Sequence, residues 1–246
     1  MKVVVLGGTS GMGRALARQL VARGDAVFLL GNDAAELARS TADLSAIKQE
    51  AQPVGSALCD LERPETFVPA LDAADAALGK FDAVIVTAAM FATQEVLESD
   101  VELTRRLVTV NYAHTVVFCE HVRQRLLERG GGWLTVFSSV AGDRGRKPVA
   151  IYGSSKAGIS VYLEALDHKY RAAGLSVLCV KPGFVRTAMT AGLKPPPFAG
   201  EPEAVARAVL SAMDRRKPLV YAPPVWGLVM LVIRNLPRAV MRRVSF

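Results

Sequence analysis

Short apolar runs rich in β-branched residues alternate with longer amphipathic stretches along the chain. The short runs predict buried strands, and the stretches between them repeat apolar residues at helical spacing, as in Met12–Arg23 and Val101–Arg129. Strand and helix in alternation predict an α/β fold with right-handed crossovers, a doubly wound parallel sheet and helices on both faces. The seven predicted strands are Val3–Leu6, Ala26–Leu30, Val54–Cys59, Ala83–Val86, Trp133–Phe137, Ser176–Val180 and Leu219–Ala222.

The composition is compatible with one large domain. The chain has 246 residues, of which 51% are hydrophobic and 22% charged, and its mean hydropathy is +0.26. No Gly/Ser-rich or Pro-rich linker divides it, so we expect one domain over residues 1–222 and a tail over residues 223–246. The opening MKVVVLGG has an apolar run far shorter than that of a signal peptide, which predicts a cytoplasmic protein.

Cysteines and histidines give no sign of a disulfide framework or a metal site. Cys59, Cys119 and Cys179 are odd in number and widely spaced. We therefore expect buried free thiols. The three histidines share no ligand spacing with them, so no metal is assigned.

The net charge of +7 is carried by the end of the chain. From Arg215 onward there are seven basic residues and no acidic ones, which leaves 23 basic and 23 acidic residues before it. A balanced body argues against nucleic acid as a partner and makes the basic tail a separate question.

A glycine-rich turn follows the first predicted strand. In GGTSGMG, Gly7, Gly11 and Gly13 are spaced G-x-x-x-G-x-G, and the last falls inside the next helix. Such glycines let a pyrophosphate approach the amides of a helix N-terminus, although glycine turns also join strands to helices without any ligand. Gly31-Asn32-Asp33 follows the second strand with neither an acid nor an arginine directly at its end, so the choice between NADH and NADPH stays open.

Polar residues also follow later strands. Asp60 follows the third strand and Ser139 the fifth, and IYGSSKAG places Tyr152 and Lys156 four residues apart on a helix. Each has an ordinary structural interpretation: a turn aspartate, a capping serine, and a pair that covers a helix surface. However, the carboxyl ends of parallel strands meet at one edge, where ligands bind in such sheets.

Taken in order, GGTSGMG, Asp60, Asn111, Ser139, Tyr152-Gly-Ser-Ser-Lys156 and Pro182-Gly183 resemble the short-chain dehydrogenase/reductase family, from Lys2 to about Ala222. The resemblance implies a single Rossmann-type doubly wound domain and a catalytic role for four residues. Tyr152 would exchange a proton with the substrate oxygen, Ser139 would hydrogen-bond that oxygen, and Asn111 would anchor a water linking Lys156 to solvent. An ammonium one helical turn from a phenol is expected to lower the phenol's pKa.

The same resemblance implies NAD(P)H as cofactor, a ketone or secondary alcohol as substrate, and a homo-oligomer. The residues it assigns to cofactor binding are Gly7, Ser10, Gly11, Met12, Gly13, Asn32, Asp60, Ala88, Lys156, Pro182, Gly183 and Thr187. Two departures from the family's usual pattern concern the adenosine side: Thr87-Ala88-Ala89-Met90 stands where an Asn-rich motif is usual, and Leu6 stands where a threonine is usual.

The tail, residues 223–246, is apolar and basic. Its uncharged run Val225–Ile233 is too short to cross a bilayer. Pro237 is expected to divide it into two short helices, with Asn235 as the cap of the second. One helical face would carry the apolar residues and another the basic ones, a pattern typical of a helix lying on an anionic membrane. The alternative is a segment packed on a second subunit or over the substrate mouth. The apolar face consists of Val229, Ile233, Leu236, Val240 and Val244. The basic face consists of Arg234, Arg238 and Arg242.

A narrower resemblance concerns GDRGRK, IYGSSKAG, VKPGFVRTAM and the tail. These segments look like the reductases of decaprenylphosphoryl-2-keto-ribose and related polyprenyl-phosphoryl keto-pentoses. That resemblance implies a lipid-linked keto-sugar, a flavin-dependent oxidase as partner, and a place at the inner face of the membrane. The competing interpretations are a reductase or dehydrogenase for a soluble ketone or alcohol, and a non-catalytic dinucleotide-sensing regulator.

Overall fold

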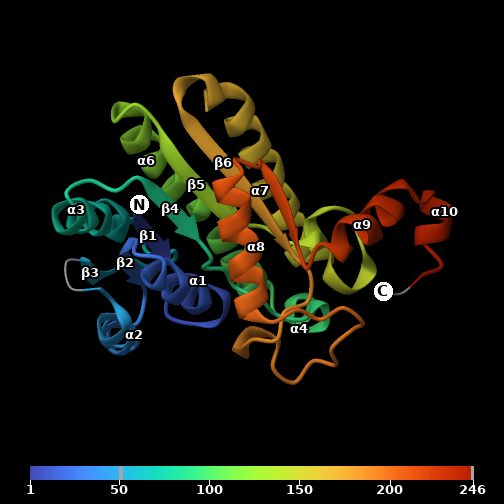
Figure 1. The fold of residues 1–246 in the computed structure, drawn as a ribbon. Coiled ribbons are helices and arrows are strands. Elements are labelled where there is room, and N and C mark those ends of the chain that lie inside the picture. The colour runs from blue at the N-terminus through green and yellow to red at the C-terminus, as the bar shows by residue number, and fades with distance from the viewer. Residues whose placement is uncertain (50–51, 245–246) are drawn as a thin grey trace.

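The computed structural model describes residues 1–49 and 52–244. Its centre is a seven-stranded sheet in the order β3-β2-β1-β4-β5-β6-β7, with every neighbouring pair parallel (Figure 1). The predicted fold class is confirmed, and the strand ends differ from prediction by at most two residues. The strands are β1 (Lys2–Leu6), β2 (Ala26–Gly31), β3 (Val54–Leu58), β4 (Ala83–Val86), β5 (Gly132–Phe137), β6 (Leu175–Pro182) and β7 (Leu219–Ala222).

Helices cover both faces of the sheet. One buried apolar cluster joins the sheet to α1, α2 and α8 through residues such as Leu16, Leu37 and Val205. The other joins it to α3, α6 and α7 through residues such as Phe118 and Leu163. These two cores explain why the strands are continuous apolar runs in the sequence, because both faces of each strand are buried. The helices are α1 (Gly11–Ala22), α2 (Ala34–Ile47), α3 (Phe67–Leu78), α6 (Thr115–Glu128), α7 (Ala150–Tyr170) and α8 (Pro202–Asp214).

The strand order reverses between β1 and β4. The chain moves outward from β1 through β2 to β3, then returns to place β4 on the other side of β1. The loops after β1 and β4 therefore diverge at the carboxyl edge of the sheet and open a crevice there.

The stretch predicted as one helix, Val101–Arg129, is continuous but not uniformly α-helical. It consists of α5 (Val101–Val108), a π-helical segment (Thr109–His114) and α6, and it follows the short α4 (Gln94–Ser99). Such π segments occur mostly as single turns inside α-helices, frequently at functional sites.

The three cysteines are free and buried, as predicted. Burial raises the pKa of the Cys59 thiol to about 12, despite a hydrogen bond from Thr66 that acts in the opposite direction. Desolvation likewise raises the pKa of Cys119. Thiols in this state are poor nucleophiles at neutral pH.

The tail forms α9 (Val225–Asn235) and α10 (Arg238–Met241), on the side of the molecule opposite α3 (Figure 1). The break before Pro237 is confirmed. The prediction that Asn235 caps the second helix is wrong: Asn235 is the last residue of α9 and its amide donates to the Leu231 carbonyl. The residue at the cap position of α10 is Pro237, which has an extended backbone conformation.

Part of the predicted apolar face of the tail packs inside the molecule, namely Val229 and Ile233, whereas Val240 of the same face is 40% exposed. Met230 and Ile233 are buried and form a cluster with Val140, with Val229 packed beside them. Three apolar residues of α9 outside the predicted face also point outward: Leu228, Leu231 and Val232 are 69%, 58% and 62% exposed. None of the described helices has the length and hydropathy needed to span a bilayer.

We expect Met230→Ala to lower the free energy of unfolding by roughly 2–5 kcal/mol, because it leaves a cavity at a fully buried position. Leu228→Ala, on the exposed face of the same helix, should change it by no more than about 0.5 kcal/mol. Urea unfolding of both variants measures the difference. Equal stability of the two variants would show that α9 does not pack on Val140.

Candidate active site

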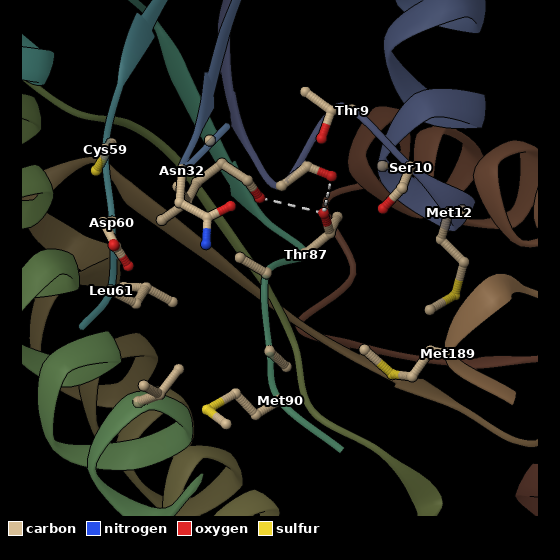
Figure 2. Close-up of a pocket in the computed structure, with 18 of the residues that line it drawn as sticks. Thr9, Ser10, Met12, Asn32, Cys59, Asp60, Leu61, Thr87, Met90 and Met189 are labelled. Carbon is tan, nitrogen blue, oxygen red and sulfur yellow. Dashed lines mark hydrogen bonds between the residues drawn. The ribbon is translucent and has the colours of Figure 1, made fainter. Parts of the chain in front are cut away.

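A cleft opens at the carboxyl edge of the sheet, beyond the ends of the paired strands β1 and β4 (Figure 2). Its walls come from the glycine-rich turn after β1, the ends of β2 and β3, the loop after β4 and a segment after β6. Nine residues assigned to the cofactor by the sequence line it: Gly7, Ser10, Gly11, Met12, Gly13, Asn32, Asp60, Ala88 and Thr187.

The glycine-rich turn is held close to the end of β4. A Cβ on Gly7, whose φ is +88°, would lie 2.6 Å from the Ala88 nitrogen, and one on Gly13 would overlap the Gly7 carbonyl. The Thr87 hydroxyl lies 3.1 Å from the Leu6 carbonyl oxygen and 3.0 Å from that of Gly7 (Figure 2). Thr87 therefore ties β4 to the turn at the position where the family usually has asparagine.

The N-terminus of α1 is open to the cleft. Ser10 occupies the cap position, but its side chain makes no capping hydrogen bond. The first amides of the helix therefore have no side-chain acceptor, and the positive end of the helix dipole lies at a wall of the cleft. This arrangement fits the pyrophosphate of a dinucleotide.

The N-terminus of α2 is different, because Asp33 caps it. Its carboxylate accepts from the amides of Ala35 and Glu36 at 2.8 and 3.0 Å. The residue that borders the cleft after β2 is the uncharged Asn32. Asp33 is therefore a capping residue. No acid at the end of β2 is then free to bind the hydroxyls of a ribose.

Asp60 serves a turn and lines the cleft as well. One carboxylate oxygen accepts from the Glu62 amide at 2.9 Å and the other from the Arg63 side chain at 3.2 Å. Both oxygens thus have partners within the chain, and the carboxylate is held rigidly beside the Asn32 end of the cleft (Figure 2).

Asn111 lies in the π-helical segment and is 1% exposed. Its side-chain oxygen accepts from the Met90 amide at 2.7 Å, and its side-chain nitrogen donates to the Met90 carbonyl at 2.8 Å. Both ends of the side-chain amide are therefore occupied in holding the loop after β4.

Ser139 lies just after β5, and Tyr152 and Lys156 lie on α7. Ser139 acts to lower the pKa of the Tyr152 phenol, and its Oγ accepts a hydrogen bond from the Ala141 amide at 3.1 Å. The Tyr152 ring packs edge-on against Phe91 with centroids 5.2 Å apart. Lys156 is 3% exposed. Its Nζ donates to the Phe137 carbonyl at 3.0 Å and lies 5.8 Å from the centre of the Tyr152 ring.

The predicted lowering of the Tyr152 pKa by Lys156 is not found in this arrangement. Burial raises the pKa of Tyr152 to about 12, and the influence of Ser139 offsets only part of this rise. Burial also lowers the pKa of Lys156 to about 8. The prediction from helical spacing is wrong because it counts the attraction between the charges and leaves out the cost of desolvating them.

Pro182 ends β6 and Gly183 follows it. Neither lines the cleft, whereas Thr187 does. The Gly183 amide donates to the Ala222 carbonyl at 3.0 Å. The indole of Trp226 occupies the space that a Cβ on Gly183 would need. This glycine therefore permits close packing of the tail on the end of β6.

Residues 1–197 match the family model described as short chain dehydrogenase. The chain belongs to the short-chain dehydrogenase/reductase family. An uncharacterized oxidoreductase of Mycobacterium tuberculosis is 33% identical to it over 243 residues, covering 98% of this chain and 96% of the relative. One from Streptomyces coelicolor is 34% identical over 248 residues, covering 98% and 94%.

Solved structures share the fold of this short-chain dehydrogenase. A short-chain dehydrogenase from Sphingobium yanoikuyae in complex with NADPH gives a TM-score of 0.81 at 23% identity, covering 97% of this chain and 98% of the other. A variant of actinorhodin polyketide ketoreductase with NADPH gives 0.80 at 22%, covering 89% and 95%. The protein is an oxidoreductase of this family, and its cleft fits NAD(P).

Sequence reasoning missed a buried polar cluster in this short-chain dehydrogenase. Asp143, whose side chain is 2% exposed, accepts hydrogen bonds from Lys181 on β6 and from the Tyr221 hydroxyl on β7. The cluster anchors the loop that leaves Ser139. GDRGRK contains Asp143 and carries part of the narrower resemblance, but nothing in its pattern names partners that lie far along the chain.

We predict that kcat/KM for carbonyl reduction falls as the pH rises through about 8. A pKa of about 8 means that Lys156 would lose its proton there in the free enzyme, whereas Tyr152, with a pKa raised to about 12, would keep the proton that the family resemblance expects it to exchange. Below the pKa of Lys156 the profile should be flat, and above it the rate should fall roughly tenfold per pH unit.

Lys156→Arg keeps its charge across this range and is the control. It should be slower than wild type but without the fall near pH 8. A wild-type profile that stays flat to pH 10 would contradict a role for the charged form of Lys156.

Proposed function

We propose that the protein is an NAD(P)H-dependent reductase that converts a ketone to a secondary alcohol, and that its substrate is a lipid-linked keto-sugar. The observation that carries the reductase assignment is the grouping of Ser139, Tyr152 and Lys156. None of the three lines the cleft, but Tyr152 packs on Phe91, the residue that follows Met90 of the cleft wall. A regulator that only senses a dinucleotide has no need for this set of residues.

The proposed chemistry assigns one task to each side chain. The nicotinamide, when bound, supplies the hydride. Tyr152 donates its phenolic proton to the carbonyl oxygen, which requires the protonated form that burial favours. The Ser139 hydroxyl hydrogen-bonds the same oxygen, and Lys156, oriented by the Phe137 carbonyl, places its positive charge near the tyrosine.

NADPH is the cofactor that the end of β2 favours. An acid there would bind the ribose hydroxyls of NADH, but Asp33 is committed to capping α2 and Asn32 is neutral. The Arg14 guanidinium donates to the carbonyl of Thr9, a residue of the same cleft, and pairs with Glu36 at 3.5 Å. A cation beside this cleft suits the additional phosphate of NADPH.

The tail supports contact with an anionic membrane surface. Its outward residues Leu228, Leu231 and Val232 form an exposed apolar strip at helical spacing. No acid occurs from residue 215 onward. The strip is flanked by four basic residues that make no ion pair within the described chain: Arg234, Arg238, Arg242 and Arg243. Apolar insertion beside uncompensated positive charge is the chemistry of an interfacial helix.

A lipid-linked substrate would explain why a reductase has such a tail. The resemblance of GDRGRK, VKPGFVRTAM and the tail to polyprenyl-phosphoryl keto-pentose reductases supports it. The ketone would then be supplied by a flavin-dependent oxidase acting at the inner face of the membrane. The rival is a soluble ketone: carbonyl reductase family member 4 of Xenopus tropicalis is 27% identical over 221 residues.

We also propose a homo-oligomer. Apolar side chains on α5, α6 and α7 are exposed in the single chain: Val101, Val108, Val117 and Val161. A second copy of the chain is the partner that would cover them.

Deuterium tracing tests the reaction. Wild type and Tyr152→Phe are each given NADH or NADPH that carries deuterium at the reactive carbon, together with a membrane-containing lysate. Lipid and aqueous fractions are then analysed by mass spectrometry. We expect tyrosine-dependent label on a lipid-linked sugar, with NADPH as the better donor. Label confined to the aqueous fraction would exclude the lipid-linked substrate, and label independent of Tyr152 would exclude this catalytic assignment.

Vesicle flotation tests the tail. We expect wild type to float with vesicles rich in anionic lipid, and Leu231→Glu to lose at least about tenfold in binding, because a charge would enter the bilayer interface. Val68→Glu on α3, at the opposite side of the molecule, is the matched exposed control (Figure 1). Equal binding of the two variants would assign the strip to another partner.

A further inference from the structure

Ser139 begins a single tight turn that lies directly on α7. Its Oγ accepts from the Ala141 amide at 3.1 Å, and its carbonyl accepts from the Gly142 amide at 3.0 Å. A Cβ on Gly142 would lie 2.7 Å from the Ala157 nitrogen, so the turn touches the backbone of the helix that carries Tyr152. The place of Ser139 relative to Tyr152 therefore depends on how this turn is held.

The turn also decides the hydrogen-bonding role of the Ser139 hydroxyl. Its bond from the Ala141 amide uses a lone pair of Oγ and leaves the single hydrogen of the hydroxyl to be donated. A carbonyl oxygen that gains negative charge during reduction requires such a donor. The turn therefore presents Ser139 to the reacting oxygen as a donor.

Asp143, the residue that follows the turn, is held by two neighbouring strands. Lys181 on β6 and Tyr221 on β7 are paired in register. Lys181 Nζ donates to Oδ1 of Asp143, and the Tyr221 hydroxyl donates to Oδ2 at 2.7 Å. Desolvation and the bond to Asp143 raise the pKa of Tyr221 to about 12, so this phenol keeps the proton that it donates. We call these three side chains the Asp143 clamp.

The clamp adds little to the stability of the fold. The Asp143 side chain is 2% exposed and that of Lys181 is 12% exposed. Removing two charges from water costs at least about as much as their attraction returns, so a buried pair of this kind is a weak source of net stability. Its clearest effect is on position, because both oxygens of the carboxylate are fixed to the carboxyl edge of the sheet.

We propose that Asp143 is a positioning residue for ketone reduction, which holds Ser139 so that its hydroxyl donates to the substrate oxygen. Asp143 does not line the NAD(P) cleft, and it acts through the turn that begins at Ser139. This proposal rests on the reductase function proposed above and deepens it. Lys181 and Tyr221 contribute only by fixing the carboxylate.

Hydrogen exchange, followed by mass spectrometry, tests the clamp without any substrate. Tyr221→Phe removes one donor and leaves the bond from Lys181 to Asp143 in place. The amides of Ala141, Gly142 and Asp143 are all bonded within the turn, and in this variant they should exchange roughly tenfold faster.

Tyr162→Phe is the matched control, because the Tyr162 hydroxyl also donates to a carboxylate at 2.7 Å, that of Glu120. It should leave exchange in the turn as it is in wild type. Exchange that is equally slow in Tyr221→Phe would show that the clamp does not hold the turn, and would overturn the proposal.

Kinetics test the catalytic consequence, with saturating NADPH and acetophenone as the probe ketone. Tyr221→Phe should lower kcat roughly 5- to 20-fold, because a small displacement of a catalytic group reduces the rate steeply. The Kd for NADPH should stay within about twofold of wild type, since Tyr221 and Asp143 do not line the cleft. If acetophenone is not reduced, the initial rate of deuterium transfer in the membrane-containing lysate replaces kcat.

A double-mutant cycle shows whether the clamp acts through Ser139. In a Ser139→Ala background, Tyr221→Phe should lower kcat by no more than about twofold, because the group that the clamp positions is already absent. Tyr162→Phe should have no effect in either background. Equal losses from Tyr221→Phe with and without Ser139 would mean that the clamp supports the fold in general, and would overturn the proposal.

The two experiments separate this proposal from the proposed function. Faster exchange in Tyr221→Phe with an unchanged kcat would reject the positioning role and leave the reductase standing. Faster exchange in Tyr221→Phe, together with a wild type that transfers no deuterium to any product, would reject the reductase while the clamp itself stands.

Discussion

All seven strands run in the same direction, and the rest of the structure depends on this constraint. Parallel strands need crossover connections, so each strand delivers its following loop to the same edge of the sheet. The reversal of order between β1 and β4 separates two of these loops and leaves a cleft between them. Residues far apart in sequence, such as Gly11, Asp60 and Thr187, line one cleft for this reason, and none of them needs a direct bond to another.

Prediction from the sequence succeeded where local pattern and topology were sufficient. Apolar runs located every strand to within two residues, and strand ends indicated which side chains would share the edge. It failed where the outcome depended on packing. Ile233 belongs to the face predicted to meet a membrane, but it packs on Val140. Asparagine is a residue type that often caps helices, but Asn235 is the last residue of α9 and does not cap α10. The partners of Asp143 lie on β6 and β7, and no local signal relates them to it.

Burial also sets the electrostatics of α7. Lys156 lies where water cannot solvate an ammonium, and its hydrogen bond to the Phe137 carbonyl fixes its direction without supplying a counter-charge. Tyr152 and Lys156 are consequently both biased toward their neutral forms. A substrate oxygen that acquires negative charge next to them changes this balance, because it gives the ammonium a counter-charge and the phenol an acceptor.

The π-helical segment Thr109–His114 has a consequence for how this chain tolerates insertions and deletions. Successive residues of an α-helix are rotated by about 100°, so a single residue gained or lost between α5 and α6 would turn everything after it by that angle. The apolar face of α6, which carries Phe118 and Val122, would leave the sheet, or else Asn111 would swing away from Met90. The length of this stretch is therefore constrained even where its exposed side chains are free to vary.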